Sequence, residues 1–192
     1  MSDFDRDKWN AKYSDSSFAP TEPSAVLTGL VEYLPLCGRA IDIAGGAGRN
    51  AIWLAQRGLE TILVDISAVG LTLARDRAAA AGVEIYTMEI DLEQQHLPPD
   101  SFDVISSVCY LGRDLFPQFP ELLVEQGILI VIQPTKKNLE RHEKPPFDFL
   151  YDEGELRNLA VGLEILHYHE GWSADDRHDA VLVARKPPTP VV

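Results

Sequence analysis

The stretch Ile41–Asn50, IDIAGGAGRN, decides the fold, because three glycines occupy four positions directly after an apolar run. The run from Arg39 to Ala44 is short, apolar and bounded by glycines, as expected of a buried strand. Glycine permits unusual backbone dihedrals and lets a ligand approach the main chain. A tight turn alone would need only one glycine, so three glycines indicate a ligand. The stretch therefore predicts a strand, a ligand-binding turn and a helix.

Strand-like and helix-like segments alternate outward from this turn. Predicted strands cover residues 39–44, 60–65, 84–90, 102–108 and 127–133, with two closing strands at 163–169 and 180–185, expected to pair antiparallel. Predicted helices cover residues 50–57, the segment from a Ser67 cap to Gly82, about 115–124, and 152–160. This alternation predicts an α/β fold, with a parallel sheet between two layers of helices. Ligands in such sheets bind beyond the carboxyl ends of the strands.

Length and composition narrow the class of protein. The chain has 192 residues, 45% of them apolar and a net charge of −13, which fits one globular domain. The negative charge disfavours nucleic acid, and no apolar run is long enough to cross a membrane. The acidic start does not resemble a signal peptide, so we expect a cytoplasmic protein with a small-molecule substrate. Cys37 and Cys109 lack metal spacing and are expected to be small buried side chains.

The glycine turn fits a dinucleotide cofactor. The spacing Gly46-x-Gly48-x-x-Ala51 satisfies the dinucleotide pattern GxGxxG/A. Asp65 ends the second strand, near the place of a ribose-binding acid. A nicotinamide-dependent oxidoreductase is therefore an alternative, although this motif alone is not specific.

Two further acids favour a different ligand. Asp42 lies inside the first strand, where its charge would oppose a pyrophosphate. Asp91 follows the third strand and can accept a hydrogen bond from an adenine amino group, with Leu92 against the ring. Acids at three strand ends suit an adenosine with a positively charged tail. In addition, too little of the chain remains to form the separate substrate domain of a dehydrogenase. The pattern therefore favours S-adenosyl-L-methionine.

On four motifs the chain resembles the class I S-adenosylmethionine-dependent methyltransferases. They read DIAGGAGRNAIWLAQRG (42–58), LVDIS (63–67), DLEQQHLPPDSFDVI (91–105) and YLGRDLF (110–116). The resemblance is narrower to the tellurite-resistance and thiopurine-methyltransferase-like branch. It implies a three-layer, doubly wound Rossmann-like fold with a seven-stranded, mostly parallel sheet and a C-terminal antiparallel strand. We expect one domain over 1–192, with a lid or helical segment at 1–38 and a proline-rich tail at 187–192 that frays. The product would be S-adenosyl-L-homocysteine, and the chain a monomer or a homodimer.

The resemblance also assigns the cofactor site. Asp42, Gly46 and Gly48 would form the loop at the methionine end, Asp65 would bind the ribose and Ile66 would pack on the adenine. Asp91 and Leu92 would hold the other side of the adenine. The transferred methyl group would face Ser106 or Ser107, with Trp9 and Tyr13 closing over the site. Simpler roles stay open: Asp65 and Asp91 as caps, and Trp9 with Tyr13 as a hydrophobic stripe.

The acceptor side is less defined. Candidates are Tyr110 and Arg113 after the fourth strand, and Arg141 and His142 in the loop 134–151, which is either a lid or a solvated connection. In-line methyl transfer needs a general base only for a protonated nucleophile, so a thiol or a metalloid oxyanion is a candidate acceptor. Cys109 stands where relatives often have a histidine. No metal site is expected, and a non-catalytic cofactor-binding module remains an alternative.

Overall fold

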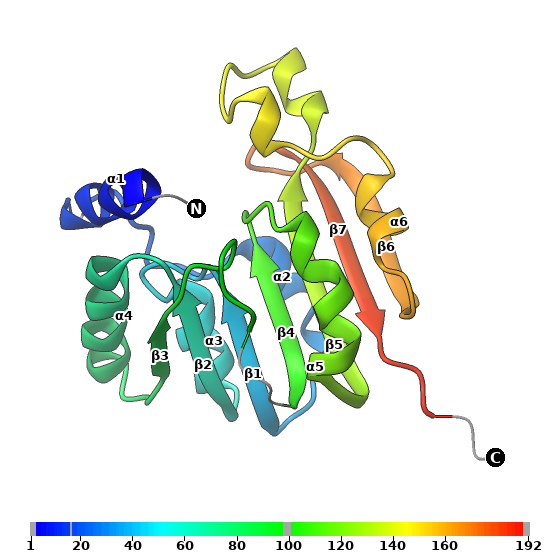
Figure 1. Cartoon of the computed structure of the whole chain (residues 1–192), viewed down its shortest axis with the longest axis horizontal. Coiled ribbons are helices and arrows are strands. Elements are labelled where there is room, and N and C mark those ends of the chain that lie inside the picture. The colour runs from blue at the N-terminus through cyan, green and yellow to red at the C-terminus, as the bar shows by residue number, and fades with distance from the viewer. Residues whose placement is uncertain (1–2, 16, 98–100, 190–192) are drawn as a thin grey trace.

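The computed structural model describes residues 3–15, 17–97 and 101–189. Their strands form a seven-stranded sheet in the order β3-β2-β1-β4-β5-β7-β6 (Figure 1). β7 (His178–Arg185) runs antiparallel to both of its neighbours, β5 (Leu123–Pro134) and β6 (Glu164–Trp172). The remaining pairings are parallel. This is a doubly wound, Rossmann-like arrangement with a C-terminal antiparallel strand, so the predicted fold class is confirmed.

The order of the strands creates a switch point in the sheet. The chain builds β1 (Gly38–Ile43), β2 (Leu59–Asp65) and β3 (Tyr86–Glu89) outward, then returns to place β4 (Phe102–Val108) on the other side of β1. The loops after β1 and β4 therefore leave the sheet in opposite directions at neighbouring strand ends. Such a point is where ligands bind in open α/β sheets.

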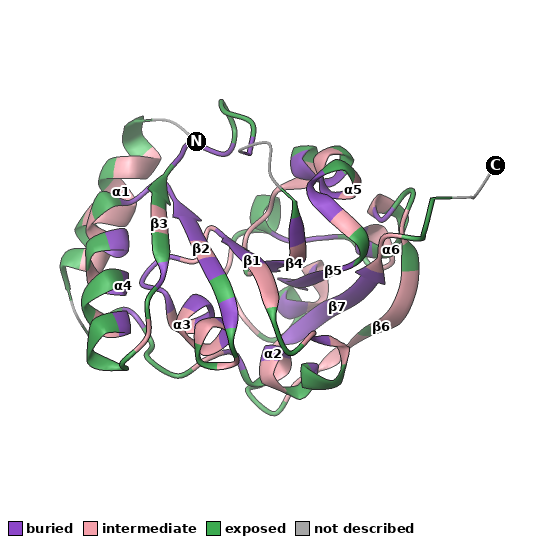
Figure 2. Ribbon diagram, turned by 90° about the horizontal axis from the view of Figure 1, so that it is seen from below, coloured by how far each residue is buried: buried purple, intermediate pink, exposed green. Residues whose placement is uncertain are grey.

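Helices cover both faces of the sheet. One face carries α2 (Ala25–Gly29), η1 (Val31–Tyr33), α3 (Arg49–Gln56) and α4 (Ala68–Ala80). The other carries η2 (Arg113–Gln118), α5 (Phe119–Leu122) and α6 (Glu155–Leu159). Leu54 packs in the core of the first face, and Phe119 and Leu156 pack in that of the second. The buried residues run along the strands between these layers (Figure 2).

Two segments lie above the carboxyl ends of the parallel strands. Helix α1 (Asp3–Ser14) packs beside α4, over the ends of β2 and β3 (Figure 1). The loop after β5, with the short helices η3 (Lys136–Glu140) and η4 (Phe147–Phe149), rises above β5 and β7. The predicted site is therefore flanked by part of the segment 1–38 and by the loop 134–151, for both of which a role as a lid stays a prediction.

Some sequence predictions were wrong in detail. The helix expected at about 115–124 is a 3₁₀ turn followed by four α-helical residues, because Pro117 and Pro120 remove amide donors and break a regular helix. Leu123 and Val124 instead begin β5. Both cysteines, Cys37 and Cys109, are exposed rather than buried. The predicted tail 187–192 lies partly outside the described residues. Within the described part of the chain, no helix is long and apolar enough to cross a bilayer.

Candidate functional site

The glycine turn folds tightly over the end of β1. Ala44, Gly46 and Gly48 have positive φ angles of 52°, 57° and 82°. The amide of Gly48 donates a hydrogen bond of 3.0 Å to the carbonyl oxygen of Gly45, and Gly48 is the N-cap residue of α3. Left-handed conformations of this kind favour glycine, which explains two of the three glycines. The turn brings main-chain amides to the start of α3, where the helix dipole attracts negative charge.

Asp42 lies beneath this turn and is 1% exposed. Its Oδ1 accepts a hydrogen bond of 2.6 Å from Ser106 Oγ, whereas Oδ2 has no hydrogen bond of normal geometry within the described residues. Burial raises the pKa of Asp42 to about 7, against the opposing effects of Ser106 and the nearby Arg49 charge. Asp42 is thus a buried acid that supports the turn from below.

Asp65 connects the end of β2 to the glycine turn. Its Oδ2 accepts a hydrogen bond from the Gly46 amide, and Oδ1 accepts one from the Ser67 amide, both at 2.8 Å. Burial raises the pKa of Asp65, although these two bonds favour the ionised form. Ser67 in turn caps α4 by accepting a bond of 3.0 Å from the Gly70 amide. The cap of α4 is therefore Ser67 rather than Asp65, and Asp65 lines the cavity.

A cavity of about 270 Å³ lies at these strand ends. Five of the residues predicted for the site line it: Trp9, Tyr13, Asp65, Ile66 and Tyr110. The others predicted for the cofactor stand around it, with Asp42, Leu92, Ser106 and Ser107 buried. Their contacts with a ligand stay predictions. The structure does bring the ends of β1, β2 and β4 together with the N-terminal helix around one space.

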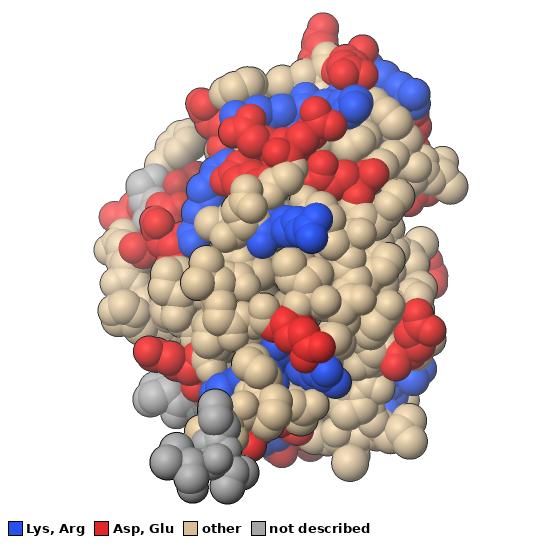
Figure 3. All heavy atoms as spheres, turned by 90° about the vertical axis from the view of Figure 1, so that its right-hand side faces the viewer, with Lys and Arg blue, Asp and Glu red and all other residues tan. Residues whose placement is uncertain are grey.

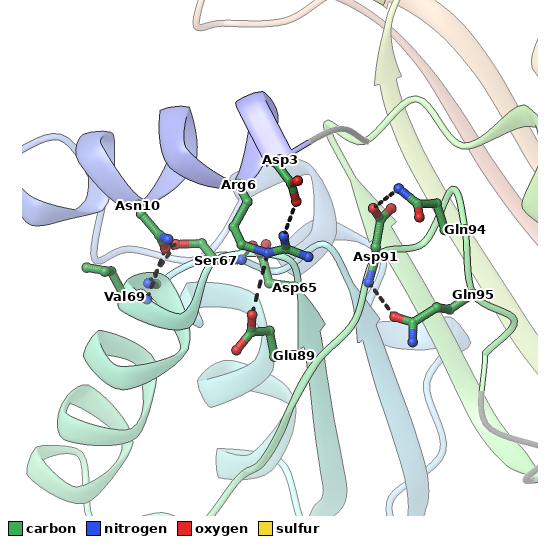
Figure 4. Close-up of polar contacts among 11 residues, drawn as sticks. Asp3, Arg6, Asn10, Asp65, Ser67, Val69, Glu89, Asp91, Gln94 and Gln95 are labelled. Carbon is green, nitrogen blue, oxygen red and sulfur yellow. Dashed lines mark hydrogen bonds and ion pairs between the residues drawn. The ribbon is translucent and has the colours of Figure 1, made fainter.

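Helix α1 is docked over this cavity by three contacts. The Asn10 side-chain oxygen accepts hydrogen bonds from Ser67 Oγ at 2.7 Å and from the Val69 amide at 3.3 Å (Figure 4). Arg6 Nε lies 3.6 Å from Glu89 Oε1 at the end of β3. The third contact is the ring of Tyr13.

Tyr13 sits against two glycines. A Cβ atom added at Gly70 would lie 2.9 Å from Tyr13 Cδ2, and one added at Gly46 would overlap the Tyr13 hydroxyl. Glycine is unfavourable inside a helix by about 1 kcal/mol relative to alanine. Its presence at Gly70 is explained by the space that Tyr13 needs.

Asp91 is placed differently from Asp65. Its side chain accepts a hydrogen bond from Gln94 Nε2 at 2.9 Å (Figure 4). It also accepts one from the Glu93 amide at 3.1 Å, so it caps the turn after β3. It is buried and is not among the residues that line the cavity. Its predicted contact with adenine stays a prediction that would require this turn to rearrange or to present a free lone pair.

The four acceptor-side candidates are not brought together. Tyr110 lines the cavity. Arg113 forms a two-pronged ion pair with Glu155, with Nη2 2.9 Å from Oε2, and its guanidinium stacks on Tyr151 at 4.8 Å. It thereby fastens η2 to α6.

Arg141 and His142 are also held elsewhere. Arg141 pairs with Asp176 and lies 3.7 Å over the ring of Trp172. His142 Nε2 lies 2.6 Å from the Asp176 carbonyl oxygen. Both side chains thus join the loop 134–151 to the β6–β7 hairpin.

Sequence reasoning missed several cavity residues. Arg49 and Asn50 directly follow the glycine turn and line the cavity, as do Phe18 and Cys109. The first turn of α3 points at the strand ends, so the position of Arg49 directly after Gly48 was a usable signal. Phe18 lies far from any motif, and no pattern in the sequence marked it. As regards metals, no cluster of three or more candidate ligands occurs in the described ranges.

Comparison with known proteins agrees with this geometry. Residues 40–126 match the family model described as a methyltransferase domain. Hemagglutinin 1 from Eikenella corrodens is 23% identical in an alignment of 168 residues, and the alignment covers 83% of this chain. The chain spans only 55% of the length of that curated relative.

Solved structures share the fold. TehB from Haemophilus influenzae superposes with a TM-score of 0.71 and 18% identity, over 93% of this chain and 67% of that one. Magnesium protoporphyrin IX methyltransferase from Synechocystis was solved with S-adenosylhomocysteine bound. It superposes with a TM-score of 0.71 and 18% identity, over 96% of this chain and 99% of that one. Of the two enzyme classes that the glycine turn predicts, the domain match supports methyl transfer.

Proposed function

We propose that this chain, an S-adenosylmethionine-dependent methyltransferase, methylates a small thiolate or oxyanion by in-line transfer. The proposal includes membership of the tellurite-resistance and thiopurine-methyltransferase-like branch, which the structural similarity to TehB favours. It treats residues 1–192 as one catalytic domain, in which the segment 1–38 supplies a lid. The match to a methyltransferase domain supports the reaction class, and the cavity supports the choice of acceptor.

The residues around the cavity fit an adenosine with a cationic sulfonium. Asp65 presents a carboxylate 6% exposed beside the buried Ile66, which suits a ribose diol and an adenine ring. The buried acid Asp42 lies below the glycine turn, where its ionised form would favour positive charge. Bound S-adenosylmethionine would supply a methyl group already activated by the positive sulfur. The chain would then align the acceptor with that methyl group and exclude water from the cavity.

The class of acceptor that we propose follows from the protonation of the titratable groups that line the cavity. Burial raises the pKa values of Tyr13 and Tyr110, so both phenols stay protonated at neutral pH. Desolvation of the sulfur raises the pKa of the Cys109 thiol, although the residue as a whole is exposed. Asp65 is already engaged with two main-chain amides.

The described lining therefore offers no spare base near neutral pH. An acceptor that must lose a proton during transfer would need such a base. A thiolate or an oxyanion is already deprotonated, so its lone pair can attack the methyl group without a base. This chemistry favours those two acceptor classes over alcohols and protonated amines.

The test begins with cofactor binding. Calorimetry with S-adenosylmethionine, S-adenosylhomocysteine and NAD should show micromolar binding of the first two only. Asp65→Ala should weaken it by about tenfold or more, because a hydrogen bond to a charged group contributes about 1.5–3 kcal/mol. Asp76→Ala, which removes an exposed acid from α4, is the matched control and should bind normally.

Turnover is then measured on a panel of thiols, metalloid oxyanions, alcohols and amines. Transfer of one methyl group to thiols or oxyanions alone would support the proposal. Transfer to alcohols would show that a base is present. Binding of NAD alone would overturn the reaction class, and cofactor binding without any turnover would favour the non-catalytic module.

A further inference from the structure

Two lysines of α1 lie at the aromatic wall of the cavity, and a third lies in the loop after β5 that α1 contacts. Lys8 and Lys12 lie on α1, one turn apart, and Lys144 lies in the loop after β5. Lys8 Nζ lies 5.6 Å from the centre of the Phe149 ring, so α1 and that loop touch across the site. We propose that Lys8, Lys12 and Lys144 form a cationic gate that selects an acceptor carrying a negative charge. This inference rests on the proposed function and names its substrate class.

The gate stands on the aromatic wall of the cavity. Lys12 Nζ lies 4.3 Å from the centre of the Trp9 ring and 5.2 Å from that of Phe18, and both rings line the cavity. Lys8 Nζ lies 5.9 Å from the Trp9 ring. A cation over a ring face is attracted to it while its N–H donors stay available for another partner. The rings therefore position the ammonium groups without neutralising them.

The other cations of the same loop are neutralised. Lys136 pairs with Asp152 at 2.8 Å, and Lys137 pairs with Glu153 at 3.2 Å. Arg141 pairs with Asp176. Figure 3 shows the result on the neighbouring face, where Lys and Arg atoms lie against Asp and Glu atoms over the upper part of the molecule.

The three gate lysines differ, since the described residues offer no ion pair or hydrogen bond to their ammonium groups. The contrast matters in a chain with a net charge of −13. A local positive site there attracts an anion that the rest of the surface repels.

The three charges also act on one another. The pKa of Lys12 is lowered by partial burial and by the charges of Lys8 and Lys144. Like charges held this close destabilise one another, and an anion between them removes the repulsion. An acceptor with a carboxylate or an oxyanion group would place that charge beside Lys12, at the part of the cavity lined by Trp9 and Phe18.

The experiment uses two probes that differ by one charge, 4-mercaptobenzoate and 4-mercaptobenzamide. Their affinities for the full chain saturated with S-adenosylhomocysteine are measured by calorimetry. The wild type should bind the benzoate more tightly. Lys8→Met, Lys12→Met and Lys144→Met should each reduce this preference by about two- to fivefold, as expected of a partly exposed charge pair. Lys137→Met removes a paired lysine from the same loop and should leave the preference unchanged.

The outcomes separate this inference from the proposed function. Equal affinity for both probes in the wild type, or a preference that survives all three substitutions, would overturn the gate even if both thiols are methylated. Weaker binding of S-adenosylhomocysteine itself in the lysine variants would also overturn it, because the lysines would then hold the cofactor carboxylate. Charge-selective binding without methylation of any thiol or oxyanion would support the gate and contradict the proposed reaction.

Discussion

Ser106 Oγ donates a hydrogen bond of 2.6 Å to Asp42 Oδ1, across the parallel pairing of β4 with β1. The two residues are in register and both are buried. Because β1 and β4 flank the switch point of the sheet, this bond joins its two halves directly below the glycine turn. A carboxyl group enclosed in this way must affect stability as a function of pH.

The first prediction concerns that pH dependence. Burial raises the pKa of Asp42 to about 7, whereas an unfolded aspartate titrates near 3.9. As pH rises from about 4 to 7, the unfolded chain loses this proton before the folded chain does, so the contribution of Asp42 to the free energy of unfolding falls. Asp42→Asn should remove this loss, which is on the order of 4 kcal/mol at most.

Urea unfolding at several pH values between 4 and 8 would measure the effect. The free energy of unfolding of the wild type should decrease more steeply with pH than that of Asp42→Asn. Asp76→Asn, on the exposed side of α4, should follow the wild type. Parallel curves for Asp42→Asn and the wild type would show that Asp42 is ionised in the folded protein throughout this range.

A second prediction follows from the ring of Tyr13. Gly70→Ala places a methyl group 2.9 Å from Tyr13 Cδ2, while it favours the helical state of α4 by about 1 kcal/mol. The global stability should stay equal or rise, and α1 should be displaced from α4. Cleavage near residues 14–20 by a protease should become faster, and the fluorescence of Trp9 should change.

The matched control is Gly29→Ala, because nothing lies within 4 Å of the added carbon there. It should leave both signals unchanged. If Gly70→Ala behaves like this control, the docking of α1 does not depend on the Tyr13 contact. The cofactor affinity of both variants then shows whether the docked helix contributes to binding.

The third prediction concerns Asn10. Its side-chain oxygen accepts hydrogen bonds from Ser67 Oγ and the Val69 amide, and Ser67 also donates its amide to Asp65. Asn10→Ala should therefore release α1 at a cost of about 1 kcal/mol, the usual net contribution of a hydrogen bond. Hydrogen exchange should show faster exchange of the α1 amides. Exchange in α1 that matches the wild type would contradict this. Asn158→Ala, at an exposed position of α6, should leave α1 unaffected.

The central part of the sheet was predictable because β1, β2, β4 and the second half of β5 are buried, largely apolar runs. Asp65 was predictable for a related reason, since the register of β1 with β2 brings its strand end beside the glycine turn. Local patterns did not reveal how α1 packs. Tyr13 reaches Gly46 and Gly70 from far along the chain, and the contact appears only once the fold brings these segments together.

The acceptor side was harder for a similar reason. The position of Arg113 after the fourth strand made it a reasonable candidate to bind the substrate. In the structure its guanidinium instead pairs with Glu155, which lies 42 residues away in sequence. Ion pairs of this kind depend on long-range packing, which a single sequence does not encode in any local spacing. The same holds for Arg141, which Asp176 engages from the β6–β7 hairpin.

The last prediction tests whether Arg113 is structural. Arg113 donates hydrogen bonds to Glu155 and to the Leu150 carbonyl oxygen, stacks on Tyr151, and lowers the pKa of Glu155. Arg113→Met should reduce the free energy of unfolding by about 1–3 kcal/mol, because charged hydrogen bonds are lost. The affinity for S-adenosylhomocysteine and the KM for a thiol acceptor should stay within twofold of the wild type, or about 0.4 kcal/mol. Arg157→Met, on the exposed side of α6, is the matched control for stability. A large rise in KM with unchanged stability would instead assign Arg113 to the acceptor.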